Sequence, residues 1–143
     1  MDMSVNWWAV IVAAIVMFVI GAVWYSPPLF AGRWRTLLGM SEEQMRAGLP
    51  AGMVAGIVSY LVMAYILARF IIHYGTPSLG SGVLVGFMAW LGFVATVLIG
   101  QVFYERRSFT LWLINNGYLL IGLLVMGAIL GWWHSGGAAP TAA

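Results

Sequence analysis

The stretch "GAVWYSPPLF", residues 21–30, ends a long apolar run on two aromatic residues, a serine and two prolines. Proline has no backbone N–H and cannot continue a helical hydrogen-bond ladder, so a helix that begins near Val5 ends here. Tryptophan and tyrosine are enriched where a membrane-spanning helix reaches the bilayer surface. Trp24 and Tyr25 therefore mark the interface end of a first transmembrane span over residues 5–26.

The rest of the chain shares this apolar character. Of its 143 residues, 63% are hydrophobic and 7% charged, with a mean hydropathy of +0.97, whereas about 25% are charged in a soluble domain. Three further stretches, residues 51–74, 79–104 and 108–133, exceed the roughly 20 residues that cross a bilayer. The sequence predicts an all-α membrane protein, with four transmembrane helices bundled in one domain (1–134) and a flexible tail over 135–143.

The connection after the first span has its own helical pattern. Large apolar residues recur at helical spacing on one side of it, which predicts a short interfacial helical segment between the first and second spans: Phe30, Trp34, Leu37 and Leu38. Ser41 and Gln44 form a capping box that starts a second helical piece. We expect this piece to end near Gly48, before Pro50 starts the next span.

The arginines predict the orientation. Five of the six lie in the first and third connections (Arg33, Arg35, Arg46, Arg106 and Arg107), and only Arg69 lies toward the other side. By the positive-inside rule these connections are cytoplasmic, and both termini are outside. The four-residue connection 105–108 also predicts that the last two spans form an antiparallel hairpin.

Several function classes are excluded by residue type. The chain has no cysteine and no lysine, which removes disulfides, thiolate catalysis and Schiff-base chemistry. Every acidic residue belongs to a terminus or a connection, so no mid-membrane carboxylate can drive proton-coupled export. The sequence has no Gly-rich phosphate-binding loop and no zinc-binding motif, and no serine is spaced with a His or carboxylate that could act as its general base. Six scattered arginines do not make a nucleic-acid surface. We therefore expect no enzymatic activity, no cofactor and no nucleic-acid partner.

Small residues recur at helical spacing in three of the spans, which permits close approach between helices. They are Gly52, Gly56 and Ser59; Gly82 and Gly86; Gly92, Thr96 and Gly100; and Gly127 and Gly131. Packing within the bundle explains them, and a dimer interface on the third span is the alternative.

Three amides lie about two turns inside the cytoplasmic end of the last two spans: Gln101, Asn115 and Asn116. Polar groups at that depth need partners. Hydrogen bonds between helices supply them in one interpretation, and a site for a lipid headgroup or small solute does so in the other. A passive channel lined by these amides and Thr96 is a related alternative.

Tyr65, Arg69 and His73 recur every four residues on the second span, near the outer interface. Arg69 either extends to the outer headgroups, with Asp2 on the same side, or forms an anion or lipid-phosphate site. His73 and His134 both lie at outer span ends, so a haem held by two imidazoles is a further hypothesis, as is a bound quinone.

The stretch from residue 5 to 34, with the late "NNGYLLIG", resembles family 1761 of the domains of unknown function. Its most specific part is "NW" followed by "WYSPxLFxxxW", here Asn6, Trp7, Trp24, Tyr25, Ser26, Pro27, Leu29, Phe30 and Trp34. Pro28 and Arg33 depart from the leucine and lysine expected there. The resemblance implies a small four-span protein of the bacterial cytoplasmic membrane and no established activity.

Together these patterns predict a small non-enzymatic membrane protein that acts through helix–helix or lipid contacts. Its partners would be the lipid bilayer and either a second copy of the chain or another membrane protein to which it is an accessory subunit. A passive transporter or channel, and a haem- or quinone-binding protein, are the two alternatives.

Overall fold

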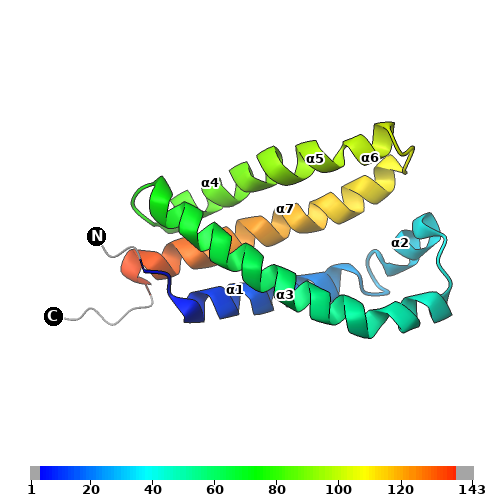
Figure 1. Ribbon diagram of the computed structural model, residues 1–143, viewed down its shortest axis with the longest axis horizontal. Helices are drawn as coiled ribbons and strands as arrows, with labels where there is room; N and C mark the ends of the chain where they lie inside the picture. Colours follow the sequence, from blue (N-terminus) through cyan, green and yellow to red (C-terminus); the bar gives the residue numbers. More distant parts are fainter. Residues whose placement is uncertain (1–3, 138–143) are drawn as a thin grey trace.

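The computed structural model describes residues 4–137, and that part is helical, with no strand (Figure 1). Four helical stretches are long and apolar enough to cross a membrane: Trp7–Trp24, Glu42–Tyr74, Leu79–Phe103 and Phe109–Gly136. The first is α1 (Trp7–Trp24), the second α3 (Glu42–Tyr74) and the fourth contains α7 (Phe109–Trp132). A short helix, α2 (Ala31–Leu38), lies between α1 and α3. The predicted all-α membrane fold is confirmed.

The ends of the helices follow from local chemistry. The Oδ1 of Asn6 caps α1 by accepting the backbone N–H groups of Trp8 at 3.0 Å and Ala9 at 3.2 Å. The Asn6 N–H donates in turn to Nε2 of His134, 2.9 Å away just beyond α7. The start of α1 and the end of α7 therefore meet at one end of the bundle. The arginine-bearing connections around α2 and after α6 lie at the other (Figure 1).

The third and fourth spans pack backbone against backbone, as the short connection predicts. A Cβ atom on Gly82 of α4 (Leu79–Trp90) would run into the carbonyl oxygen of Gly127 on α7. Likewise, one on Gly86 would meet the carbonyl of Leu123, and one on Gly131 the carbonyl of Ser78. Only glycine permits this contact, which confirms bundle packing for these small residues.

The predicted break near Gly48 is wrong, because α3 runs without interruption from Glu42 to Tyr74 with Pro50 inside it. The capping box at Ser41 starts the helix as predicted, with the Gln44 side chain bonded back to the Ser41 N–H. Proline removes only the bond to the Arg46 carbonyl, four residues earlier, and a carbonyl near the membrane surface can bond to water. The helix therefore continues through a residue that would end it elsewhere.

The third span is interrupted after Trp90, which the sequence did not predict. A π-helical segment, η1 (Leu91–Ala95), separates α4 from the short helices α5 (Thr96–Leu98) and α6 (Gly100–Phe103). The indole N–H of Trp90 donates to the main-chain carbonyl of Asn116 at 3.0 Å, tying this region to α7. A second π-helical turn, η2 (Trp133–Gly137), follows α7. The predicted tail begins within it, and residues 138–143 lie outside the described part of the chain.

Candidate functional site

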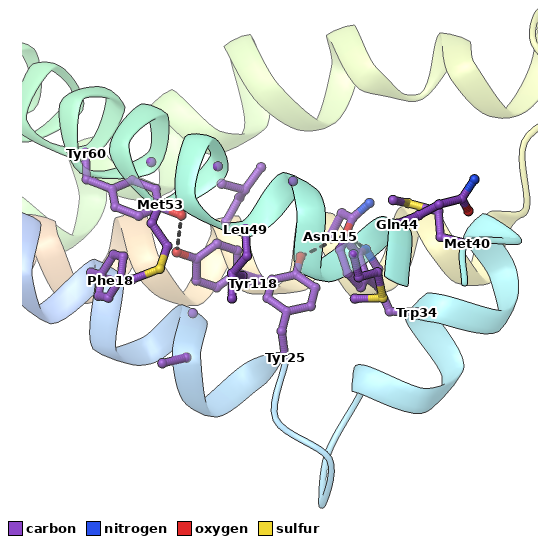
Figure 2. Close-up of a pocket in the computed structure, with 17 residues that line it drawn as sticks. Phe18, Tyr25, Trp34, Met40, Gln44, Leu49, Met53, Tyr60, Asn115 and Tyr118 are labelled. Carbon is purple, nitrogen blue, oxygen red and sulfur yellow. Dashed lines mark hydrogen bonds between the residues drawn. The ribbon is translucent and has the colours of Figure 1, made fainter. Parts of the chain in front are cut away.

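An open cavity of about 840 Å³ lies between α1, α2, α3 and α7, at the end of the bundle that carries α2 (Figure 2). We call it the elbow cavity, since α2 and the start of α3 form a bend around it. Its lining is Phe18, Gly21, Ala22, Tyr25, Trp34, Met40, Gln44, Met45, Gly48, Leu49, Gly52, Met53, Gly56, Tyr60, Asn115, Tyr118 and Leu119. The wall is mostly apolar, with amide and hydroxyl groups at a few points.

The motif that ends the first span folds the α1–α2 connection onto α7. The Trp24 indole N–H donates to the carbonyl of Ile114 at 3.0 Å, and its ring packs on Phe30 with ring centres 4.8 Å apart. Ser26 bonds back to the Val23 carbonyl, and Pro27 lies in the turn that follows. The aromatic residues of "WYSPxLFxxxW" thus position α2 over the end of α7.

Asn115 is the polar centre of the elbow cavity. Its Oδ1 accepts hydrogen bonds from the Tyr25 hydroxyl at 2.8 Å and from the Trp34 indole at 3.0 Å (Figure 2). An amide oxygen can only accept, so the Tyr25 hydroxyl donates its hydrogen to Asn115. The Nδ2 of Asn115 has no hydrogen-bond partner within residues 4–137, and it is not among the fully buried unpaired atoms there. Its two N–H groups are therefore free to bind something in the cavity.

Two tyrosines meet deeper in the elbow cavity. The Tyr118 hydroxyl lies 3.0 Å from the carbonyl of Met17 and 2.9 Å from the Tyr60 hydroxyl. A carbonyl can only accept, so the single hydroxyl hydrogen of Tyr118 goes to Met17 and Tyr60 donates to Tyr118. The pair links α1, α3 and α7 by hydrogen bonds. Within the described part of the chain, no Asp, Glu, Arg, Lys or His side chain lines the cavity.

Glycines form the α3 wall of the elbow cavity. Gly48, Gly52 and Gly56 recur every four residues and all line it. A Cβ atom on Gly48 or Gly52 would meet no heavy atom within 4 Å. Within the bundle, then, the small residues of this helix border open space instead of packing against another helix, unlike those of α4 and α7.

The structure separates the other predicted amides from Asn115. The Nδ2 of Asn116 bonds to the Trp112 carbonyl at 3.0 Å, while Asn116 Oδ1 and Trp112 Nε1 are buried without a partner among residues 4–137. The side chain of Gln101 makes no hydrogen bond within those residues, and the Thr96 hydroxyl bonds to the Gly92 carbonyl. Of the four residues proposed to line a channel, only Asn115 lines the elbow cavity.

The residues predicted near the outer interface lie at the opposite end. Tyr65 stacks on Trp7 with ring centres 5.2 Å apart, and Nδ1 of His73 is 2.7 Å from the Arg69 carbonyl. Arg69 forms no ion pair within the described residues, and Asp2 lies outside them. His73 lines a smaller cavity of about 350 Å³ with Phe70, Tyr74, Val85, Met88, Ala89 and Phe93.

His134 uses both ring nitrogens in hydrogen bonds. Nε2 accepts the N–H of Asn6, so Nδ1 carries the proton and donates to the Leu130 carbonyl at 2.8 Å. In this arrangement no lone pair is free to ligate a haem iron together with His73. Within residues 4–137 no group of three or more His, Asp or Glu side chains is placed to hold a metal ion.

Comparison with known proteins gives one match. The model of a family described as "Protein of unknown function (DUF1761)" matches residues 8–131, most of the chain. No curated protein and no solved structure matches this chain.

Proposed function

The chain belongs to the DUF1761 family, and on that premise we propose that it is a non-enzymatic, multi-pass membrane protein that holds one membrane lipid in the elbow cavity. We place it in a bacterial cytoplasmic membrane with the elbow end in the cytoplasm and both termini outside. The arginine distribution supports this orientation, because five of the six arginines lie at the elbow end, in α2, in the first turns of α3 and in the connection before α7.

The elbow cavity itself carries the proposal. Small-molecule sites are concave, of about 300 to 1,000 Å³ and mostly apolar, with a few polar groups that orient the ligand. The elbow cavity has a volume of about 840 Å³, a mostly apolar wall and two amides with unused donors, Asn115 and Gln44. It is open, at the end of a bundle whose outer surface faces lipid. A lipid with its chains along α3 and its polar part at Asn115 fits this distribution.

The residue types that line the elbow cavity also support the proposal that the protein is not an enzyme. The residues around the elbow cavity include no His, Asp, Glu, Lys or Cys, so no general base or activated nucleophile faces it. Tyrosine, asparagine, glutamine and tryptophan supply its polar groups. These groups can bind and orient a ligand.

Filling the elbow cavity tests lipid binding. Gly52→Leu places a side chain where a Cβ meets nothing, so the bundle can accept it while the cavity shrinks. Gly80→Leu is the matched control, because Gly80 is exposed, a Cβ atom there would meet only the Ser78 hydroxyl at 3.9 Å, and it lies outside the cavity. Native mass spectrometry of protein released from nanodiscs should find one retained lipid in the wild type and Gly80→Leu, and none in Gly52→Leu. Equal retention in all three would refute the proposal.

Association with a second copy is a further part of the proposal. Gly92 and the Thr96 side chain are not packed against another helix of this chain, since Gly92 has open space around it and Thr96 bonds to its own helix. This leaves the outward stripe of the third span available to a neighbouring helix. The same mass spectra report stoichiometry, and a monomer at all protein concentrations would exclude the association.

A further inference from the structure

The two amides that line the elbow cavity, Asn115 and Gln44, both have free N–H donors, and the two acceptor positions of the Asn115 oxygen are already used. The Oδ1 of Asn115 already accepts from the indole of Trp34, a group that can only donate, so the amide orientation is fixed with Nδ2 free. The Oε1 of Gln44 accepts the backbone N–H of Ser41 at 3.0 Å in the capping box, which fixes that amide in the same sense. A ligand must therefore supply acceptors at this end of the cavity.

The charges of the bend around the elbow cavity favour an anion. Arg35 is paired with Glu42 at 2.8 Å, but Arg33 and Arg46 form no ion pair within residues 4–137. Arg33 precedes Trp34 and Arg46 follows Met45, and both of these neighbours line the cavity. Glu43 is the only unpaired acidic residue in the same bend, so the free charges there are two positive and one negative.

We propose that the elbow cavity selects an anionic phospholipid, with its phosphate at the N–H groups of Asn115 and Gln44 and its charge balanced by Arg33 and Arg46. This inference rests on the proposed lipid binding. Phosphate oxygens only accept hydrogen bonds, which matches the two amides, and a phosphodiester without an attached ammonium group keeps its negative charge for the arginines. A zwitterionic headgroup would bring its own cation next to two guanidinium groups.

The substitution Gln44→Glu removes the amide donors of Gln44 without disturbing the start of α3. Gln44→Glu keeps an oxygen for the Ser41 N–H, because glutamate also completes a capping box, and it replaces the free donors by a carboxylate that repels phosphate. Gln101→Glu is the matched control, since it makes the same charge change at a side chain with no hydrogen bond and no place in the cavity.

The probe is a nanodisc with equimolar phosphatidylglycerol and phosphatidylcholine of the same acyl chains, with the retained lipid identified by native mass spectrometry. We expect phosphatidylglycerol to be enriched about tenfold in the wild type and in Gln101→Glu, as one hydrogen bond to a charged group predicts. The enrichment should disappear in Gln44→Glu. Equal retention of both lipids by the wild type would overturn the selectivity, while no retained lipid at all would overturn the proposed function itself.

A second pair of variants tests the arginines. Arg33→Gln with Arg46→Gln should lose the enrichment and still retain one lipid per protein, because the apolar wall is unchanged. Arg106→Gln with Arg107→Gln removes the same charge from the other connection at this end of the bundle and should keep the enrichment. Loss of enrichment in both double variants would mean that overall charge, and not this site, attracts the anionic lipid, and would refute the inference.

Discussion

Replacing Gly82 by alanine tests how the third and fourth spans are held together. The new methyl group would overlap the carbonyl oxygen and carbon of Gly127, and it would also press on the Cα of Gly131. All of these atoms belong to the backbone of α7, so no side chain can rotate away to make room. The helices must separate along the contact, which also includes the Gly86 and Gly131 approaches.

The cost follows from known over-packing effects. Inserting a methylene into a well-packed core lowers the free energy of unfolding by about 1 to 3 kcal/mol. We expect a loss of about 3 kcal/mol from the overlap in Gly82→Ala, because the overlapping atoms are held by the backbones of two helices and cannot rotate away. Alanine in place of helical glycine returns about 0.5 to 1 kcal/mol. We therefore expect Gly82→Ala to be less stable than the wild type by about 2 kcal/mol.

The assay is the free energy of unfolding in mixed micelles, measured by steric trapping or by titration with a denaturing detergent. Gly80→Ala is the matched control, because it lies in α4 as well and its Cβ would meet only the Ser78 hydroxyl, at 3.9 Å. Both variants gain the same helix preference, so the difference between them, about 3 kcal/mol, measures the overlap alone. Unfolding free energies that agree within about 0.5 kcal/mol would refute the backbone contact.

Three other predictions concern single groups. Tyr118→Phe removes the hydroxyl shared by Met17 and Tyr60, and should lower the free energy of unfolding by about 1 kcal/mol; an unchanged value would mean that these bonds are not formed. Ser41→Ala should cost about 1 kcal/mol and speed amide hydrogen exchange in the first turn of α3, with unchanged exchange contradicting the cap. Cysteines introduced separately at Ser41 and Ser135 should react with a membrane-impermeant maleimide from the cytoplasmic and the outer side respectively; the reverse pattern would overturn the orientation.

Much of the fold is predictable because membrane spans are encoded by composition. Apolar length locates all four spans, and the aromatic and proline residues after Val23 locate the end of α1. The apolar spacing over 30–38 predicts the helix found as α2. The predicted helix boundary at Pro50 is wrong. The tendency of proline to end a helix does not interrupt α3, which is capped at Ser41 and has Pro50 near the membrane surface. The π-helical segment after Trp90 has no sequence periodicity by which to recognise it.

The candidate site was only partly visible in the sequence. The sequence identifies Asn115 and the motif residues Tyr25 and Trp34 individually, but their contact depends on how the α1–α2 connection folds against α7. The spacing of Gly52 and Gly56 predicts helix packing, since spacing alone does not say whether a neighbouring helix is present. The fixed orientation of the Gln44 amide also needed the structure, because the capping box that fixes it does not indicate a cavity beside it.

The length of α3 links this protein to the thickness of its membrane. A helix of 33 residues is about 50 Å long, whereas the hydrocarbon core is about 30 Å thick. Even a tilt of 40°, the upper end of the usual range, leaves a projection of about 38 Å, so at least about 8 Å of α3 lies among the headgroups. If its other end stays at the opposite membrane surface, a thicker bilayer would draw Gln44 and the bend toward the acyl chains, and a thinner one would push them toward water. Hydrophobic mismatch would in this way set the level at which the elbow cavity meets the lipid phosphates.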